Sequence, residues 1–473
     1  MALVLGVDSS TQSTKVEVRN ADSGVLIGSG SAPHPPVAPP CSEQDPKTWY
    51  EALLGATARA GARRPAAIAV AGQQHGLVLL GERDLPLRPA KLWNDTESAA
   101  DAKWLREQLD GGAAGWAAAV GSVPVAAFTI TKLSWVHRCE PDVFARIRRV
   151  LLPHDYLTFR LTNEFVTDRG DASGTGYWSP ASGEWRPDVL RIVDGELDWA
   201  AALPRVLGPL ESIPARDGDA IVAAGTGDNM AAALGLALEP GRVAISIGTS
   251  GTVYTVSDTP TADPSGAVAG FASACGRYLP LVCTQNATRV TDTMARLLGV
   301  DHDGLAALAL SDAATAHESV TLVPYFDGER TPERPDATGL IAGLRNDLER
   351  EHLARAAFEG VVCGLLDGLD ALGAAGVDTG DELGNQITLV GGGSRSPAYR
   401  QVLADLAQRP VVVPAGDEHV ALGACVQAAA ALHQVSPREI ARQWELGSGT
   451  VVDPTGSADR AAALRARYAA ARG

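Results

Sequence analysis

Two aspartates stand where strand-like runs give way to small polar residues, a pattern suited to phosphate chemistry. Asp8 ends the apolar run LVLGVD, and Asp228 follows the glycine-rich turn of AGTGDN. A carboxylate beside such a turn can hold a hard cation such as Mg²⁺ near phosphates. A carboxylate close to a cleft can equally accept the proton of an attacking hydroxyl. The structural alternatives are an Asx turn at Asp8 and a helix N-cap at Asp228.

Three turns rich in glycine and hydroxyl side chains follow strand-like segments of the chain. They read DSST (8–11), GTSG (248–251) and GGGSRS (391–396). Such turns direct backbone N–H groups at phosphate oxygens, because glycine permits close approach and hydroxyls add donors. A single turn of this composition is an ordinary tight turn, but three in one chain favour phosphate binding.

The first two turns belong to an internal repeat. The segment LVLGVDSSTQSTKVEV (3–18) resembles VAISIGTSGTVYTV (243–256), and each reads as a strand, a hydroxyl-rich turn and an alternating strand. The copies lie about half a chain length apart, which suggests two related domains that each open with a β-hairpin facing a shared cleft. Coincidence stays open at this point, since Gly, Ser and Thr are common turn residues.

Polar side chains also follow two other strand-like runs, in AGQQHG and LWND. Open α/β sheets bind ligands at the carboxyl ends of their strands. The residues that can hydrogen-bond a polyol there are Gln74, His75, Asn94 and Asp95. Trp93 can cover the apolar face of the same ligand. Since a lone histidine or tryptophan is often structural, residue type alone leaves this assignment open.

Short runs rich in Val and Ile alternate with stretches of helical length rich in Ala and Leu, which predicts α/β layers. DPKTWYEALLGATARA predicts a helix with Asp45 as N-cap and Pro46 at its first position. A second helix is expected over Met230 to Leu238, and the tail ADRAAALRARYAAARG predicts a terminal amphipathic helix.

With 473 residues and 45% hydrophobic content, the chain is long enough for two cores. We place the domain boundary near residue 218, in the polar stretch ARDGDA, which gives domains 1–218 and 219–473. The net charge of −16 argues against nucleic acid and anionic membrane surfaces as partners. No apolar run reaches the ~18 residues that a membrane span requires.

Several classes of protein are disfavoured by what the sequence lacks. It contains no GxGxxG, Walker A, HExxH or GxSxG motif. The start lacks a basic segment before its apolar run, so no export is expected. The six cysteines show no CxxC spacing, which predicts a reduced cytoplasmic protein with mostly buried thiols and neither a disulfide framework nor a zinc site.

The ordered motifs resemble the FGGY family of carbohydrate kinases over nearly the whole chain. They are DSSTQSTK, SEQDPKTWYEA, AGQQHG, LWND, FTITKLSWVHRCEP, LLPHDYLTFRLT, AGTGDN, SIGTSG, PYFDGERTP, GLIAGL with LARAAFEG, and GGGSRSPAYRQVLAD. The resemblance implies an α/β fold of two actin-like ATPase domains, each ribonuclease-H-like, around a central cleft. It implies a sugar site mainly in the first domain, ATP mainly in the second and Mg²⁺ between them, with phosphate transferred to the C5 hydroxyl of D-xylulose.

The resemblance also assigns roles residue by residue. Asp8 matches the family's essential aspartate near the metal and the phosphates, and Asp228 matches the general base. The substrate-binding candidates are Gln74, His75, Trp93, Asn94, Asp95 and Asn229. The ATP-binding candidates are Thr11, Ser13, Thr14, Gly248, Thr249, Ser250, Gly251, Gly391, Gly392, Gly393 and Ser396.

Two departures and two rival functions qualify this expectation. Ser10 stands where many members have glycine, and Gln74 stands where many members that act on xylulose have methionine. One rival is a kinase of the same fold acting on ribulose, another ketose or a polyol. The other is a non-catalytic actin-like sugar or nucleotide sensor, which the presence of both Asp8 and Asp228 disfavours. The sequence leaves a homodimer open.

Overall fold

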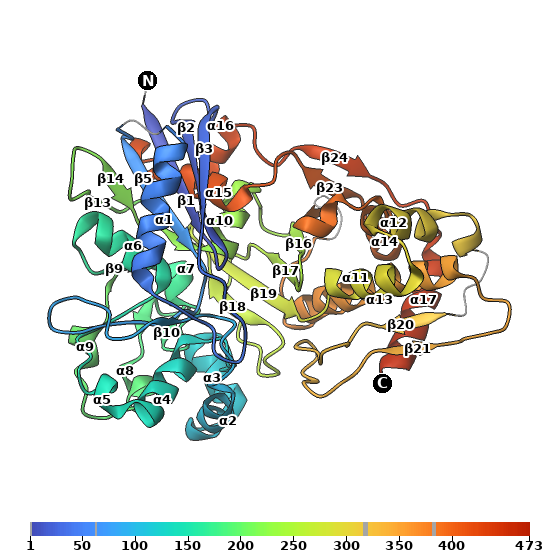
Figure 1. Cartoon of the computed structure of the whole chain (residues 1–473), viewed down its shortest axis with the longest axis horizontal. Coiled ribbons are helices and arrows are strands. Elements are labelled where there is room, and N and C mark those ends of the chain that lie inside the picture. Colours follow the sequence, from blue (N-terminus) through green and yellow to red (C-terminus); the bar gives the residue numbers. More distant parts are fainter. Residues whose placement is uncertain (1, 62–63, 316–319, 381–384) are drawn as a thin grey trace. The chain divides into compact units, whose positions relative to one another are not determined.

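The computed structural model describes residues 2–61, 64–315, 320–380 and 385–473, and its chain divides into two compact units (Figure 1). The first unit comprises Met1–Leu238, Asp258–Leu279 and Glu418–Gly447. The second unit comprises Glu239–Ser257, Pro280–Asp417 and Ser448–Gly473. The expected α/β architecture is present in both units.

The sheet of the first unit has the strand order β13-β14-β5-β1-β2-β3, and β15 also pairs with β5. β1 and β2 form an antiparallel hairpin, whereas β5 runs parallel to β1. The bounds are β1 Leu3–Ser9, β2 Ser13–Asn20, β3 Leu26–Pro33, β5 Ala67–Gly72, β13 Ser212–Pro214, β14 Ile221–Ala223 and β15 Thr226–Gly227. β14 runs parallel to β5, so the chain is still part of the first unit after residue 218, where the sequence had suggested a boundary.

The sheet of the second unit repeats this arrangement. Its strands follow the order β19-β17-β16-β22-β23-β24, with β16 and β17 as the antiparallel hairpin and β22 parallel to β16. The bounds are β16 Val243–Ile247, β17 Gly251–Thr255, β19 Tyr278–Thr284, β22 Ile387–Val390, β23 Val411–Pro414 and β24 Gly449–Val452. The two hairpins predicted from the internal repeat therefore occupy the same place in two related sheets.

Helices cover the sheet of the first unit and connect its strands. The main ones are α1 Pro46–Arg59, α6 Pro153–Thr162, α7 Arg169–Ala172, α10 Asp228–Gly235, α15 His419–His433 and α16 Pro437–Gln443. The others are α2 Ala99–Gln108, α3 Gly112–Val120, α4 Thr129–Cys139, α5 Pro141–Phe144, α8 Pro187–Leu190 and α9 Trp199–Ala202. The shorter strands are β4 Glu43–Gln44, β6 Val78–Leu80, β7 Ala90–Lys91, β8 Arg149–Leu151, β9 Val166–Asp168, β10 Trp178–Ser179, β11 Glu184–Trp185, β12 Arg205–Leu207 and β18 Ala269–Ala272.

The helices of the second unit include the predicted terminal helix, α17. The bounds are α11 Thr288–Leu298, α12 His302–Leu310, α13 Arg350–Ala374, α14 Pro397–Ala407 and α17 Ala458–Arg472. Two short strands, β20 Thr321–Val323 and β21 Leu340–Ala342, pair with each other, and single 3₁₀ turns lie at Ala313–Thr315 and Gly392–Arg395. In the first unit, α1 begins as predicted, with Asp45 as N-cap accepting a hydrogen bond from the backbone N–H of Lys47.

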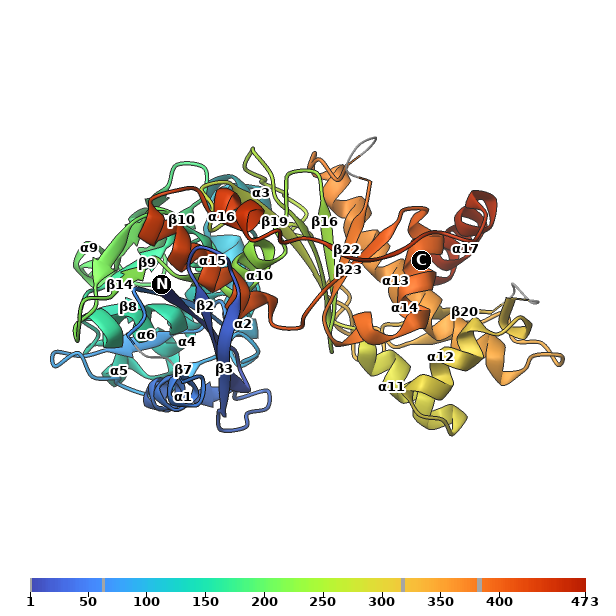
Figure 2. The same cartoon turned by 90° about the horizontal axis from the view of Figure 1, so that it is seen from above.

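Two cores lie on opposite faces of the first sheet. Leu5 and Val7 of β1 pack with Trp49 of α1 on one face, whereas Val4 packs with residues of α15 on the other. The contact with α15 is close, because a Cβ added to Gly6 would lie 2.2 Å from a backbone oxygen of that helix. α15 packs directly against β1 (Figure 1), and α10 packs against α15 (Figure 2). This packing fixes the carboxyl end of β1, where Asp8 stands.

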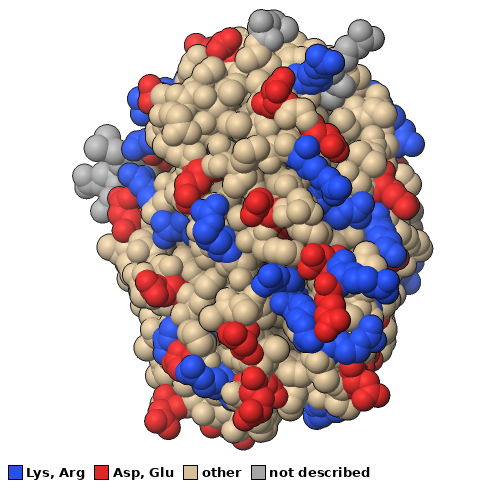
Figure 3. Space-filling view, turned by 90° about the vertical axis from the view of Figure 1, so that its left-hand side faces the viewer, with Lys and Arg blue, Asp and Glu red and all other residues tan. Residues whose placement is uncertain are grey.

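The surface and the cysteines bear on the expectations from composition. On the face drawn in Figure 3, basic and acidic side chains are intermixed. No helix in the described part of the chain is long and apolar enough to cross a membrane. The expectation of mostly buried thiols is wrong, because only Cys363 and Cys425 are buried while Cys41 and Cys139 are exposed. All six cysteines are free.

Candidate active site

Asp8 lies at the end of β1, where the chain turns back into β2. It is 4% exposed, and its Oδ1 accepts a hydrogen bond of 2.5 Å from the Ser10 hydroxyl. Burial raises the pKa of Asp8 to about 6, against the opposing effects of the Ser10 hydrogen bond and the Lys15 ammonium group. Lys15 is itself paired with Glu418 at 2.8 Å. Asp8 is thus a buried carboxylate with incompletely balanced charge, which suits a hard divalent cation.

Asp228 is the first residue of α10, and Gly227, not Asp228, is the N-cap of that helix. Its Oδ1 accepts hydrogen bonds from the backbone N–H and the side-chain amide of Asn229, at 2.8 and 2.9 Å. Burial and the neighbouring carboxylate of Asp8 raise the pKa of Asp228 to about 7, although both Asn229 bonds oppose the shift. A carboxyl group with a pKa near neutrality is suited to accept a proton.

Asn229 connects this carboxylate to the segment after β5. Its side-chain amide also donates to Gln74 Oε1 at 2.9 Å. Gln74 passes very close to the loop before α10, because a Cβ on Gly227 would lie 2.6 Å from Gln74 Cγ. Asp228, Asn229 and Gln74 therefore form one hydrogen-bonded group.

Three buried polar atoms in the segments after β5 and β7 have no hydrogen-bond partner among the described residues. They are Gln73 Nε2, Gln74 Nε2 and Asn94 Oδ1. Buried polar groups in folded proteins are nearly always paired with protein atoms, water or a ligand. Two amide donors and one acceptor are the groups that a polyhydroxylated ligand can satisfy.

Trp93 is joined to the hairpin of Asp8 by side-chain hydrogen bonds. Its indole Nε1 donates to Thr11 Oγ1 at 2.9 Å, and the Thr11 hydroxyl donates to Gln73 Oε1 at 3.0 Å. The Trp93 side chain itself is 39% exposed. The hydroxyl of Thr11, an ATP-binding candidate, therefore contacts Trp93, a substrate-binding candidate, and Gln73.

His75 follows Gln74 in a left-handed backbone conformation, with φ of +65°. Its Nδ1 lies 2.8 Å from the backbone oxygen of Gly174, and its ring centroid lies 5.0 Å from that of Phe128. Neighbours on two sides therefore fix the imidazole ring.

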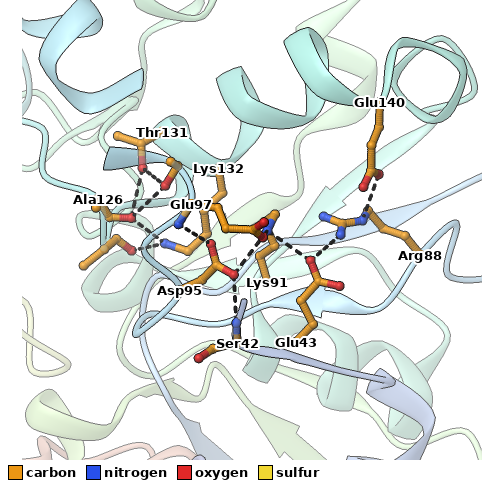
Figure 4. Close-up of polar contacts among 12 residues, drawn as sticks. Ser42, Glu43, Arg88, Lys91, Asp95, Glu97, Ala126, Thr131, Lys132 and Glu140 are labelled. Carbon is orange, nitrogen blue, oxygen red and sulfur yellow. Dashed lines mark hydrogen bonds and ion pairs between the residues drawn. The ribbon is translucent and has the colours of Figure 1, made fainter. Parts of the chain in front are cut away.

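Asp95 has a different environment from the other substrate-binding candidates (Figure 4). It is fully buried, and its Oδ2 accepts hydrogen bonds from the backbone N–H of Ser42 at 2.9 Å and from Lys91 Nζ at 3.1 Å. Lys91 is also fully buried, and its ammonium group contacts Glu97 at 2.6 Å and Glu43 at 3.0 Å. We therefore assign Asp95 to holding the loop that carries Trp93 and Asn94, because its carboxylate oxygens already have partners.

The four-residue cluster of Cys41, Glu43, Asp95 and Glu97 has ligand atoms within 4.8 Å of one another. A metal ion is not needed to balance this cluster, because the Lys91 ammonium group contacts all three carboxylates. The ring of Trp135 lies 3.9 Å from the same ammonium group. The ammonium group of Lys91 thus stands where a metal ion would otherwise stand, and its contacts stabilise the turn between β7 and α2.

In the second unit, the GTSG turn joins β16 to β17. The backbone N–H of Gly248 donates to the oxygen of Ser250, and the Gly248 oxygen accepts from the N–H of Thr288 at the start of α11, both at 3.0 Å. Thr249 and Ser250 are exposed. The turn thus presents hydroxyl side chains to solvent from a backbone that α11 anchors.

The glycine segment after β22 packs against this same hairpin. A Cβ on Gly391 would lie 2.6 Å from the backbone oxygen of Ile247, and one on Gly393 would lie 2.4 Å from its side chain. Gly391 has φ of +84°, a conformation that favours glycine. Two of the three predicted phosphate-binding turns are therefore neighbours within the second unit, while Gly392 is open to solvent.

The remaining hydroxyl candidates differ in what they contact. Thr14 is fully buried, with Oγ1 2.8 Å from His34 Nε2, so it faces the interior of the first unit. Ser13 begins β2 and is half-buried. Ser396 precedes α14, and its Oγ is buried with no partner among the described residues.

Two protein-family models account for most of the chain. The N-terminal domain of the FGGY family of carbohydrate kinases matches residues 3–235, and its C-terminal domain matches residues 243–432. The chain belongs to this family.

FGGY kinases with high similarity to this chain include two from Streptomyces. "Xylulose kinase" of Streptomyces coelicolor is 47% identical over 95% of this chain and 92% of the relative. "Xylulose kinase" of Streptomyces rubiginosus is 45% identical over the same shares. The crystal structure of xylulose kinase from Bifidobacterium adolescentis matches with a TM-score of 0.88 and 39% identity, covering 100% of this chain and 99% of that one. The predicted two-domain, actin-like fold is confirmed, and membership of the family implies that ATP is used.

Some residues that shape the site were not predicted. Gln73 stands beside Gln74 in AGQQHG, and nothing in the sequence marks it as a site residue. Its role is visible only in the structure, where it accepts a hydrogen bond from the Thr11 hydroxyl. Lys91 directly precedes LWND, and the nearby Asp95 and Glu97 could have suggested a salt bridge but not the full burial of the lysine. Asp168 and Thr226, which meet at 2.8 Å, lie far apart in sequence, and no local motif links them.

Proposed function

We propose that this FGGY kinase transfers the γ-phosphate of ATP to the C5 hydroxyl of D-xylulose, giving D-xylulose 5-phosphate and ADP. The observation that carries the proposal is the identity of 47% and 45% to two proteins named xylulose kinase, each over 95% of this chain. The role in D-xylose catabolism that this reaction would serve follows from the same likeness.

In this proposal Asp228 is the general base. The attacking hydroxyl gives its proton to the Asp228 carboxylate as the oxygen bonds to the γ-phosphorus, and the bond to the β-phosphate oxygen breaks. The pKa of about 7 lets the group hold that proton and release it again near neutral pH. Asn229 orients the carboxylate through its two hydrogen bonds to Oδ1.

The sugar contacts come from the segments after β5 and β7. Gln74 Nε2 can donate to one sugar hydroxyl and Asn94 Oδ1 can accept from another, since both atoms lack partners among the described residues. The Trp93 ring is the exposed apolar surface of this group and covers the C–H face of the sugar. His75 adds a fixed polar edge, because Gly174 and Phe128 hold its ring.

The phosphate side uses the hairpin turn of the second unit and the glycine segment beside it. Backbone N–H groups and the hydroxyls of Thr249 and Ser250 are donors for phosphate oxygens, and Ser396 Oγ offers another. Asp8 fits a magnesium ligand, because its carboxylate is buried and its pKa is raised. When bound, Mg²⁺ supplies positive charge to the phosphates.

The test is ADP release with D-xylulose, D-ribulose, L-ribulose, D-fructose, glycerol and gluconate at equal concentrations. We expect the highest kcat/KM for D-xylulose. A clear preference for a ribulose or for glycerol would show that the proposed substrate is wrong, while the proposed transfer of phosphate from ATP to a hydroxyl group would stand. Binding of ATP without sugar-dependent ADP release for any substrate would favour a non-catalytic sensor.

Two expectations from the sequence stay predictions alongside this proposal. A cytoplasmic location agrees with six free cysteines. A homodimer is tested by light scattering of the purified full chain, where a mass of twice 49.0 kDa would support it.

A further inference from the structure

A buried histidine with three aspartates lies behind the candidate sugar residues of the first unit. His154, Asp155, Asp168 and Asp171 are each no more than 2% exposed. His154 Nδ1 lies 2.8 Å from Asp171 Oδ2 and 3.3 Å from Asp155 Oδ1, and its Nε2 lies 3.8 Å from Asp168 Oδ1. Three acids surrounding one imidazole favour its protonated form. Nothing in the transfer step itself uses this cluster.

The imidazole ring is packed between the two segments that carry the site. A Cβ on Gly225 would lie 2.7 Å from His154 Cδ2, and a Cβ on Gly72 would lie 2.9 Å from His154 Cβ. Gly72 ends β5 directly before Gln73 and Gln74, and Gly225 lies three residues before Asp228. Both glycines therefore let the two segments touch the same histidine.

The acids extend this contact to the catalytic loop. Asp168 Oδ2 accepts a hydrogen bond of 2.8 Å from the hydroxyl of Thr226, two residues before Asp228. Asp168 also accepts from the backbone N–H of Asp171 at 2.9 Å, as N-cap of α7. β15, which contains Thr226, pairs with the last residues of β5.

The same short helix leads to the sugar-contacting histidine. Ser173 and Gly174 follow α7, and the backbone oxygen of Gly174 lies 2.8 Å from His75 Nδ1. A Cβ on Gly174 would lie 2.5 Å from the His75 ring, so this approach leaves no free space. Through α7, the His154 cluster thus contacts both the segment before Asp228, at Thr226, and the segment after β5, at His75.

We propose that His154 is a positioning residue of the phosphate transfer, which sets the place of Asp228 relative to Gln74 and His75. It acts through the Asp168–Thr226 bond on one side and through Gly72 and α7 on the other. Burial opposes a charge on His154, but Asp155, Asp171 and Asp168 together raise its pKa above the ordinary value. The proposal rests on the proposed kinase function, whichever sugar is the substrate.

The experiment compares His154→Gln, Thr226→Val and the double variant with the wild type. Gln removes the cation, and Val removes only the hydroxyl that donates to Asp168 while keeping the shape. Neither change touches a group that contacts ATP or the sugar. His352→Gln is the matched control, since this buried histidine lies at the start of α13 in the second unit, where its Nδ1 accepts from the N–H of Glu349. Thermal melts establish that each variant is folded.

We expect each single variant to lose about tenfold or more in kcat/KM for the sugar, since small misplacements of reacting groups cost that much. The KM for ATP should stay within about twofold, and the control should keep its kinetics. The double variant should lose little more than the larger single effect, because both changes act on Asp228 through one route.

Two results would overturn the proposal. One is a folded Thr226→Val protein with wild-type kcat/KM for the sugar, which decides the matter even if His154→Gln fails to fold. The other is a double variant whose loss equals the product of the single losses, since His154 and Thr226 would then act separately. If the wild type itself shows no sugar-dependent turnover, the proposed function fails instead.

Discussion

Replacing Asp228 by asparagine should make the first unit more stable while it removes the activity. Asparagine keeps the size of the side chain and an oxygen for the Asn229 hydrogen bonds, but it carries no charge. In the wild type, burial and Asp8 raise the pKa of Asp228 from 3.8 to about 7. The folded protein therefore resists an ionisation that the unfolded chain undergoes freely.

The size of the effect follows from that shift. About three pKa units at ~1.4 kcal/mol each set an upper limit of about 4 kcal/mol. We expect about 2 to 4 kcal/mol, because Asp228 keeps part of its surface in water and shares its shift with Asp8. A functional residue that lowers the stability of its own fold is typical of active sites.

The pH dependence has a defined sign. Below pH 3.8 the carboxyl group is protonated in both states, so Asp and Asn differ little in their effect on unfolding. As the pH rises from about 4 to about 7, the unfolded chain loses its proton first, and the wild type loses stability. The advantage of the Asp228→Asn variant should therefore grow by about 2 kcal/mol between pH 5 and pH 8 and then level off.

Urea unfolding followed by tryptophan fluorescence is the appropriate assay. All nine tryptophans lie in the first unit, so this signal reports the unit that contains Asp228. The control is Asp459→Asn, an exposed aspartate in the first turn of α17 in the second unit. In that variant, the free energy of unfolding measured by tryptophan fluorescence should stay within about 0.5 kcal/mol of the wild-type value.

The reasoning would be refuted by a stability difference that does not change between pH 5 and pH 8, because a raised pKa in the folded state requires that change. A variant less stable than the wild type at pH 8 would likewise show that Asp228 is not destabilising in the folded state. The activity is measured on the same samples by ADP release.

Three further predictions follow from the same contacts. The kcat/KM for the sugar should fall as the pH drops through about 7, as Asp228 becomes protonated, and a flat profile from pH 5 to pH 8 would contradict this. Gln74→Leu should raise the KM for the sugar about tenfold or more and leave the KM for ATP nearly unchanged, which initial rates at varied sugar and ATP will test. Lys91→Met should lower the urea stability of the first unit by about 3 kcal/mol, because the buried carboxylate of Asp95 and the half-buried carboxylates of Glu43 and Glu97 lose their cation, and wild-type stability would exclude this role.

The Lys91 prediction has a matched control on the surface. Arg148 pairs with Glu82 at 3.0 Å, but the two side chains are 50% and 79% exposed. Arg148→Met should therefore change the stability by less than about 1 kcal/mol. Equal losses in the two variants would show that burial of the Lys91 cluster does not matter.

Much of the architecture could be predicted because the relevant signals are local. The apolar run before Asp8, the turn after it and the similar segment at residues 243–256 contain a complete hairpin in a few residues. Asp45 and Pro46 mark a helix start by chemistry that acts within one turn. The domain boundary was harder, because β14 joins the first sheet by pairing with a strand about 150 residues earlier in the chain.

The residues of the site likewise divide into those that short motifs identify and those whose contacts only the folded structure shows. Asp8, Asp228 and Gln74 stand in short motifs, and the structure brings the last two together through Asn229. Ser10, a departure from the family pattern, proves to donate a hydrogen bond to Asp8. What each remaining polar group contacts depends on the folded neighbours, as the buried carboxylate of Asp95 illustrates by accepting a hydrogen bond from the backbone N–H of Ser42, 53 residues earlier in the chain. Residues that pair over such a distance in the chain have no fixed local spacing, so no sequence motif identifies the pair.

Phosphate transfer from ATP to D-xylulose, followed side by side for the wild type and the Asp228→Asn variant, tests the central claim most directly. Phosphorus NMR identifies the product. The wild type should form D-xylulose 5-phosphate and ADP in equal amounts, and the variant should be slower by about 10² to 10⁴ with ATP binding retained. Near-normal transfer by the variant, or phosphate at a hydroxyl other than C5, would contradict it.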